Sequence, residues 1–296
     1  MRSQLNIFDI PETPTGGAVI NVASVPQRSP FRYPGGKTWL IPTVRQWLKQ
    51  NHKSANILIE PFAGGGIVSL TAAFEKLADH ITMVEMDEEI AAVWEVMLNG
   101  KNKWLAEKIL KFDLNHENVK LEFDKPNKKI HDVAFCTILK NRIFHGGILA
   151  KGSGMIKNGE NGKGISSRWY PKTLHDRIIA IDYVKSKIDF INGDAFEILE
   201  DSRDNPSAYF FIDPPYTVAG KRLYTHFDID HEKLFYLTSK LKGKYMLTYD
   251  DTSEIRHLAF KYNLDFRTIP MKTTHHLEKN EIIISDNFDW WTSNND

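Results

Sequence analysis

Short apolar runs alternate with segments of helical periodicity in two separate parts of the chain. The first part begins with an apolar run at 56–60, and apolar residues then recur at helical spacing up to Leu77. A second run at 81–84 is followed by another helical pattern that ends near Met97. Apolar runs that alternate with amphipathic helices predict a parallel sheet covered by helices, so we expect an α/β fold.

The same alternation returns in the C-terminal part. Further strands are expected where apolar runs recur, at 188–191, 208–212 and 244–248. The last two runs, 265–270 and 281–285, are joined by a polar loop, which predicts an antiparallel hairpin at one edge of the sheet. The predicted fold is therefore a Rossmann-like, mostly parallel sheet with one antiparallel edge hairpin.

The stretch between the two parts has a different pattern. It has helical periodicity at 104–110 and 131–144, and then seven glycines between 146 and 164. This pattern predicts an inserted, mainly helical domain. The first residues of the chain combine prolines and glycines with polar residues and show no periodicity, which predicts a tail. The predicted boundaries are 1–28 for an N-terminal tail, 29–96 and 178–296 for the sheet domain, and 97–177 for the insertion.

Composition limits the class of protein without selecting a function. The chain has 296 residues, of which 42% are hydrophobic and 26% charged, as expected for a globular protein. No apolar run is long enough to span a membrane and the N-terminus lacks a secretion signal, so we expect a cytoplasmic protein without a membrane partner. Cys136 is the only cysteine, which excludes an intramolecular disulfide and a thiolate zinc site and predicts a buried thiol. His275 and His276 lack the His-Glu-x-x-His spacing, so no metal is expected.

Charge is distributed unevenly although the formal net charge is zero. Residues 99–177 contain 16 Lys and Arg against 8 Asp and Glu, and the rest of the chain has the opposite surplus. A basic segment in a neutral protein is typical of a module that contacts nucleic-acid phosphates. The alternative interpretation is a solvated, lysine-rich surface.

A glycine-rich loop, Glu60-Pro61-Phe62-Ala63-Gly64-Gly65-Gly66, lies directly after a predicted strand and directly before a predicted helix. Glycines at this place allow the backbone to approach a bound molecule closely. The dinucleotide motif Gly-x-Gly-x-x-Gly is incomplete, because Ser69 stands at its last position, and this disfavours a nicotinamide dehydrogenase. An acid and an aromatic residue before the glycines suit a zwitterionic amino-acid moiety better than a diphosphate.

Acidic residues end two further strands. Glu85 and Asp87 follow the glycines by about twenty residues, where an acid commonly accepts hydrogen bonds from ribose hydroxyls; helix capping is the alternative for Asp87. The segment Asn192-Gly193-Asp194-Ala195-Phe196 suits the edge and face of an adenine. Upstream, the segment Tyr33-Pro34-Gly35-Gly36-Lys37 adds an aromatic residue and a tight turn that presents a lysine.

The tetrad Asp213-Pro214-Pro215-Tyr216 combines an acid, backbone carbonyls and an aromatic face in one rigid turn. The two prolines lack amide donors and have a fixed φ, so the carbonyls of the turn stay available as acceptors. These groups are what a reaction at an exocyclic amine requires. An ordinary turn that ends a strand is the alternative.

In their order along the chain, these segments resemble the Dam-type, D12-class family of S-adenosylmethionine-dependent DNA adenine-N6 methyltransferases. The resemblance extends from about Pro30 to Asp286 and includes the Pro-Gly-Gly-Lys segment, the glycine-rich loop, the insertion and the Asp-Pro-Pro-Tyr tetrad. It implies a Rossmann-like S-adenosylmethionine methyltransferase sheet with an inserted DNA-recognition domain. The implied cofactor is S-adenosylmethionine, with S-adenosylhomocysteine as product and no metal.

The resemblance also implies roles for individual residues. The sequence departs from the family pattern at Glu85, where Asp is common, and at Ala195, where an aromatic residue is frequent. The expected cofactor contacts are Tyr33, Lys37, Glu60, Phe62, Gly64, Glu85, Asp87, Asp194, Ala195 and Asp213. The expected catalytic residues are Asp213, Pro214 and Tyr216, and the expected DNA contacts are Arg142, His145, Arg168 and Trp169.

The implied activity is site-specific methylation of adenine N6 in double-stranded DNA. An adenine in a duplex must be flipped out before its N6 can be reached by a methyl donor. Tyr216 would then stack on the base, while Asp213 and the Pro214 carbonyl would accept the N6 hydrogens. A Pro-Cys nucleophile, as a cytosine-C5 methyltransferase requires, is absent from the sequence.

Double-stranded DNA is the expected partner, a cognate restriction endonuclease is a further candidate, and the expected location is the nucleoid of a bacterium or phage host. Two alternatives stay open. One is an RNA adenine-N6 methyltransferase with the same core, and the other is a catalytically silent methyltransferase-fold protein that only binds nucleic acid.

Overall fold

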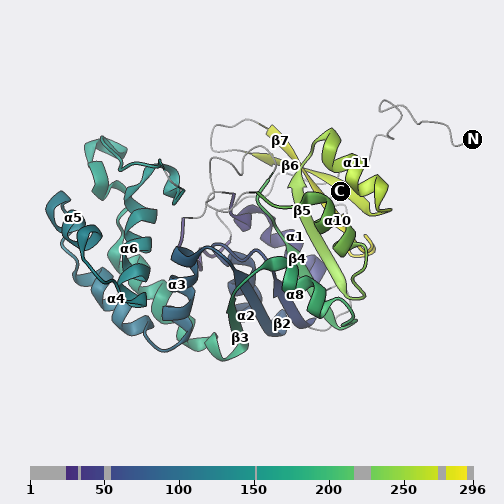
Figure 1. The fold of residues 1–296 in the computed structure, drawn as a ribbon, viewed down its shortest axis with the longest axis horizontal. Helices are drawn as coiled ribbons and strands as arrows, with labels where there is room; N and C mark the ends of the chain where they lie inside the picture. The colour runs from purple at the N-terminus through teal and green to yellow at the C-terminus, as the bar shows by residue number, and fades with distance from the viewer. Residues whose placement is uncertain are drawn as a thin grey trace, which may run out of the picture.

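A seven-stranded sheet forms the centre of the described part of the molecule (Figure 1). The structure is a computed structural model, and it describes residues 25–32, 35–49, 55–150, 152–216, 228–272 and 278–291. The strands lie in the order β3-β2-β1-β4-β5-β7-β6. Their bounds are β1 Ala55–Glu60, β2 Ala78–Glu85, β3 Ile188–Asn192, β4 Ala208–Ile212, β5 Lys244–Asp250, β6 Asp265–Lys272 and β7 Glu278–Ser285.

The sheet is parallel except at one edge. Strands β3, β2, β1, β4 and β5 run parallel to one another, whereas β7 runs antiparallel to both β5 and β6. This arrangement confirms the predicted Rossmann-like sheet with an antiparallel edge hairpin. Because the parallel strands share one direction, the segments that follow β1, β2, β3 and β4 meet at one edge of the sheet.

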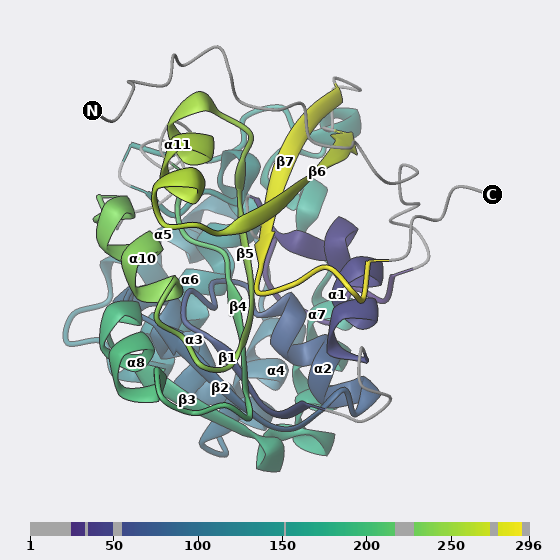
Figure 2. The same cartoon turned by 90° about the vertical axis from the view of Figure 1, so that its right-hand side faces the viewer.

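Helices cover both faces of the sheet, as Figure 2 shows. The alternation along β4 explains why both faces are apolar: Phe211 packs into one buried cluster, and Phe210 and Ile212 pack into the other. Helices that pack on the sheet in the first cluster include α1 Ile41–Leu48, α2 Ile67–Glu75 and α3 Glu88–Leu98, and those in the second include α8 Ala195–Ser202, α10 His231–Thr238 and α11 Ser253–Lys261.

The segment between α3 and β3 is mainly helical, as expected, and lies on one side of the sheet in Figure 1. Its α-helices are α4 Asn102–Lys111, α5 His116–Asp124, α6 Ile130–Ile143 and α7 Pro171–Ala180. Helix α3 packs against both α4 and α6. As a result, Leu105 of α4 and Phe135 of α6 belong to the same buried cluster as Leu58 of β1. The insertion therefore shares its hydrophobic core with the sheet.

Two further expectations concern the tail and the single cysteine. The end of the predicted tail is attached to the sheet domain, because Val25 is buried and Arg28 pairs with Glu75 at 3.3 Å. Cys136 is a buried free thiol, as predicted, and burial raises its pKa. None of the helices described is both long enough and apolar enough to cross a membrane.

Candidate functional site

A cavity of about 970 Å³ opens at the carboxyl edge of the parallel strands. Its lining includes Glu60 at the end of β1, Glu85 at the end of β2 and Asp213 directly after β4. Gly64 lies on the same lining. The structure therefore brings the glycine-rich loop and the Asp-Pro-Pro-Tyr turn together around one cavity, at the place where doubly wound sheets bind ligands.

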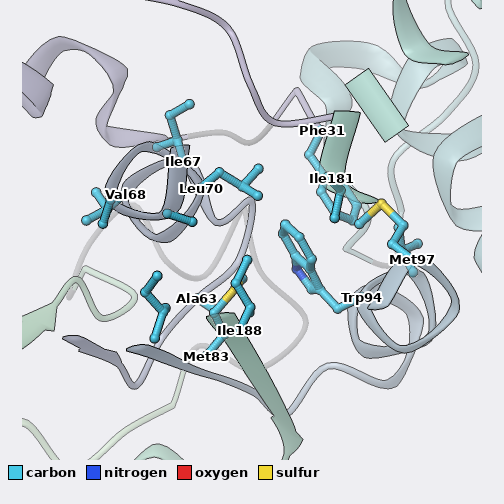
Figure 3. Close-up of a cluster of buried hydrophobic side chains, with 14 of the residues drawn as sticks. Phe31, Ala63, Ile67, Val68, Leu70, Met83, Trp94, Met97, Ile181 and Ile188 are labelled. Carbon is cyan, nitrogen blue, oxygen red and sulfur yellow. The ribbon is translucent and has the colours of Figure 1, made fainter. Parts of the chain in front are cut away.

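The glycine-rich loop is held by packing from behind. Gly64 and Gly66 have positive φ values of 47° and 61°, and Gly66 is the residue that precedes α2. A Cβ at Gly66 would lie only 2.6 Å from atoms of both Met83 and Trp94. Trp94 also donates a hydrogen bond from Nε1 to the Gly64 carbonyl at 2.8 Å. Figure 3 shows Trp94 beside the loop residue Ala63 and Met83, so the loop rests on a fixed apolar support.

Glu85 connects the glycine-rich loop to the start of α3. Its Oε2 accepts a hydrogen bond from the Gly64 amide at 2.9 Å, and its Oε1 accepts one from the Asp87 amide at 2.8 Å. Asp87 in turn caps α3, because its Oδ1 accepts from the amides of Glu89 and Ile90. The capping interpretation of Asp87 is thus confirmed, and both acids also line the cavity.

Burial changes the acid–base properties of the carboxyls around the loop. Glu60 accepts hydrogen bonds from the Ser69 amide at 3.0 Å and from the Ser69 hydroxyl. Burial nevertheless raises the pKa of Glu60 to about 8, and it raises the pKa of Glu85 to about 7. Buried carboxyls side by side favour a positively charged ligand, because such a ligand would stabilise their ionised forms.

Lys37 lies on the other side of the cavity and pairs with the acid of the tetrad. Its Nζ is 2.9 Å from Asp213 Oδ1, which also accepts a hydrogen bond from Thr248 at 2.8 Å. Only 2% of the Lys37 side chain is exposed. Burial opposes the charge on Lys37, but Asp213 and Glu281 outweigh it, so its pKa is raised. These contacts fix the position of the Asp213 carboxylate at the start of the Asp-Pro-Pro-Tyr turn.

Glu281 was not expected from the sequence and completes this network. It is buried on β7, accepts a hydrogen bond from the Tyr216 hydroxyl at 3.0 Å and lies 3.8 Å from Lys37 Nζ. Burial raises its pKa to about 7, although Lys37 opposes the rise. No local motif marks Glu281. It reaches the site because β7 runs antiparallel and places Glu281 opposite Asp250, at the carboxyl end of β5.

Tyr216 is held by aromatic and charged neighbours. Its ring stacks on Tyr249 with centroids 5.8 Å apart, and Lys37 Nζ lies 4.8 Å from the ring centroid. Burial raises its pKa well above the ordinary value. Pro215 lines the cavity, whereas Pro214 is buried. Stacking of a base on Tyr216 stays a prediction, since these contacts already occupy part of the ring surface.

The remaining expected cofactor contacts have different positions. Phe62 and Ala195 line the cavity. Asp194 is exposed and caps α8 by accepting from the Phe196 amide at 2.9 Å; it is not part of the cavity lining. Tyr33 lies outside the described residues.

The four expected DNA contacts do not form one exposed surface. Arg142 is buried in the cavity wall, with 5% of the residue exposed, and donates a hydrogen bond to the Pro30 carbonyl. Arg168 also lines the cavity. His145 is exposed, and Trp169 packs against Phe112 in the core of the insertion with centroids 6.1 Å apart. Arg142 does not belong to an exposed basic surface, because its side chain points from α6 into the cavity wall.

Acidic, cysteine and histidine side chains do not gather into a metal-binding group anywhere in the described ranges. The residues His275 and His276 lie outside those ranges. The expectation of a metal-independent reaction stays a prediction.

Comparison with known proteins gives one informative match. The model of a family described as D12 class N6 adenine-specific DNA methyltransferase matches residues 33–276. No curated protein matches the chain.

Two solved structures illustrate a distant likeness to the chain. One is a proposed RNA methyltransferase from Pyrococcus horikoshii, with 10% identity over 89% of this chain and 92% of that chain and a TM-score of 0.41. Another is precorrin-6y C5,15-methyltransferase from Geobacter metallireducens, with 11% identity over 82% of this chain and 84% of that chain and a TM-score of 0.35. Scores this low carry no argument about function.

Proposed function

Because the chain belongs to the D12 class N6 adenine-specific DNA methyltransferase family, we propose that it methylates adenine N6 at specific sites in double-stranded DNA. The single observation that carries this proposal beyond family membership is the shared cavity of Gly64 and Asp213. Its volume of about 970 Å³ lies near the upper end of the range for ligand pockets, so it has room for a nucleoside cofactor and a second base.

The family implies the use of S-adenosylmethionine, and the residues of the cavity fit this cofactor. Its sulfonium and ammonium groups are positively charged, and the buried carboxyls of Glu60 and Glu85 favour a cation. We propose that these acids, the loop at Phe62 and Gly64, and Lys37 and Ala195 hold the cofactor. Asp87 and Asp194 are further candidates for contact with the cofactor, although both carboxylates already cap helices. Tyr33 is retained as a candidate from the family pattern alone.

The chemistry proposed for the tetrad rests on the geometry of Asp213. Both contacts described above, from Lys37 and from Thr248, use its Oδ1, and we propose that Oδ2 accepts a hydrogen bond from N6. The Pro214 carbonyl would accept the other N6 hydrogen. When bound, S-adenosylmethionine supplies the methyl group, the sulfur–carbon bond breaks as the nitrogen–carbon bond forms, and S-adenosylhomocysteine is left. The proton that N6 then loses passes to Asp213 or to water.

Catalysis in this scheme comes from positioning and from charge stabilisation. Holding two reactants in line supplies a large part of a rate enhancement, and an acid beside the nitrogen stabilises the charge that develops there. The adenine must leave the duplex to enter the cavity, so the proposal includes base flipping. Tyr216 would stack on the flipped base after its present contacts rearrange. A cognate restriction endonuclease stays a candidate partner.

A methyl-transfer assay tests the proposal with radiolabelled S-adenosylmethionine and, in parallel, unmethylated double-stranded DNA and RNA. The protein is expected to label DNA and to convert adenine to N6-methyladenine in its digest. Transfer to RNA alone would refute the DNA assignment and support the RNA alternative. Absence of transfer to both polymers would refute the activity and support a protein that only binds nucleic acid.

Two substitutions test the assigned roles. Asp213→Ala and Tyr216→Ala are each expected to lower the turnover rate by at least about 100-fold, the usual loss when a group that handles a proton or positions the reactants is removed. The affinity for S-adenosylhomocysteine, measured by calorimetry, is expected to stay close to that of the unmodified protein. Asp201→Ala on the exposed side of α8 is the matched control. Full methylation by both tetrad variants would contradict the mechanism.

A further inference from the structure

The cavity wall contains a group of arginines in addition to the acids. Arg32, Arg142, Arg168 and Arg177 all line the cavity. Arg142 lies in the last turn of α6 and Arg177 in the last turn of α7, so both come from the insertion. The segment at 29–32 packs between them and the glycine-rich loop, because Ser29 Oγ donates a hydrogen bond to the Gly65 carbonyl at 2.5 Å.

Two of these guanidinium groups bond to adjacent backbone carbonyls. Arg142 Nη2 donates to the Pro30 carbonyl, and Arg177 Nη1 donates to the Ser29 carbonyl at 3.0 Å. The Nε of Arg142 is buried without a hydrogen-bond partner in the described part of the chain. Among the same residues, no carboxylate lies within ion-pair distance of Arg142 or Arg177. The pair therefore joins a buried and a half-buried guanidinium group, and both donate to neutral carbonyls.

Burial of like charges is unfavourable. Burial lowers the pKa of Arg142 to about 9, and the charges of Arg177 and Arg32 contribute to the decrease. Burial also lowers the pKa of Arg177. Taking a charge out of water without a partner of opposite sign is costly, so an arrangement of this kind fits a site that an anion completes.

We infer that Arg142 and Arg177, with Arg32 beside them, bind a backbone phosphate of the DNA strand that carries the target adenine. The inference rests on the proposed function and specifies how the substrate is held at that site. A guanidinium group presents a fork of donors that matches the oxygens of a phosphate. A flipped nucleotide stays joined to its own phosphates, so they approach the cavity with the base, and these arginines form part of the cavity wall.

The carboxylate of the cofactor is the other anion that could reach this wall. It carries one negative charge, whereas Arg142 and Arg177 together carry two positive charges. A DNA strand supplies successive phosphates. In addition, Arg142 and Arg177 belong to the insertion, whereas Lys37 and the acids expected to hold the cofactor belong to the sheet domain.

The test measures binding of a short fluorescein-labelled DNA duplex at a series of salt concentrations. Arg177→Gln is the main variant and Arg142→Gln is the second. Arg203→Gln is the control, because Arg203 is exposed, pairs with the adjacent Asp204 and does not line the cavity. The melting temperature of each variant, compared with that of the unmodified protein, shows whether the variant folds. Calorimetry with S-adenosylhomocysteine measures the cofactor site separately. Should Arg142→Gln fail to fold, Arg177→Gln keeps the inference testable.

Each phosphate contact contributes about −0.9 to the slope of log affinity against log salt. Arg177→Gln and Arg142→Gln are each expected to reduce the magnitude of this slope by about that amount, whereas Arg203→Gln keeps it. The affinity for S-adenosylhomocysteine is expected to stay unchanged. An unchanged slope overturns the inference, and an unchanged slope together with an affinity for S-adenosylhomocysteine about tenfold weaker would assign the arginines to the cofactor carboxylate.

The two proposals fail in different ways. If the unmodified protein binds the duplex with a slope that depends on the two arginines but transfers no methyl group to DNA, the proposed activity fails and the phosphate site stands. If the protein methylates DNA and the arginine variants bind like Arg203→Gln, the phosphate site fails and the activity stands.

Discussion

Substitution of Gly66 by alanine tests whether the support behind the glycine-rich loop is rigid. The new Cβ would lie 2.6 Å from Met83 Cε and 2.6 Å from Trp94 Cζ2, which is closer than real Cβ contacts. Both neighbours are completely buried, so neither can move into solvent. Displacement of Trp94 would also weaken its hydrogen bond to the Gly64 carbonyl.

The expected loss of stability has two parts. An alanine at the φ of +61° observed for Gly66 costs about 1 kcal/mol for the left-handed backbone. Overpacking of a well-packed core adds about 1–3 kcal/mol. Gly100→Ala is a matched control, since Gly100 has a φ of +85° but no atom within 4 Å of the added Cβ. The control shares the backbone cost and lacks the clash.

Urea unfolding of the two variants measures both parts. Gly66→Ala is expected to lose about 1–3 kcal/mol more than Gly100→Ala. Calorimetry is expected to show weaker binding of S-adenosylhomocysteine for Gly66→Ala, because the loop shifts with Trp94, and no change for Gly100→Ala. Equal losses of stability in both variants would refute the reasoning, because they would show that Met83 and Trp94 yield without cost.

Two further predictions concern the titratable groups of the cavity. The pKa values of Glu60 and Glu85 are raised to about 8 and about 7, so a cationic cofactor should bind more tightly as the pH rises from about 6 to about 9. Binding should also release protons, which calorimetry in buffers of different ionisation enthalpy detects. Binding that does not depend on pH would contradict this prediction. Glu281→Gln removes the negative charge near Lys37 and weakens the hydrogen bond from Tyr216. The turnover rate should therefore fall about tenfold or more, and its pH profile should lose a step near pH 7. An unchanged pH profile would count against the role of Glu281.

Local patterns predicted the strands and their order along the chain well. Each strand identified from an apolar run, such as 208–212, is a strand in the structure, because a parallel sheet buries both faces and its strands read as continuous apolar segments. The hairpin of β6 and β7 was predicted from its two apolar runs and polar loop, and it forms the antiparallel edge. The shared cavity was also predictable, because motifs that follow parallel strands lie at the same edge of the sheet.

The parts of the site that escaped prediction depend on long-range register and burial. Glu281 lies in an ordinary strand, and only its pairing opposite Asp250 brings it to the carboxyl edge. The inward orientation of Arg142 follows from how α6 packs on the segment at 29–32, which composition does not encode. The basic surplus of the insertion was visible in the sequence, but it did not distinguish a buried arginine from an exposed lysine.

The single hydrophobic core that α3 shares with the insertion has a consequence for protein engineering. If the insertion selects the DNA sequence, as proposed, its exchange between relatives would also require redesign of the side of α3 that packs against α4 and α6. An exchange confined to α4–α7 would leave mismatched side chains where α3 packs against α4 and α6. Hinge motion of the insertion as an independent unit is also disfavoured by this continuity, so we expect adjustment to a bound substrate to occur in the loops.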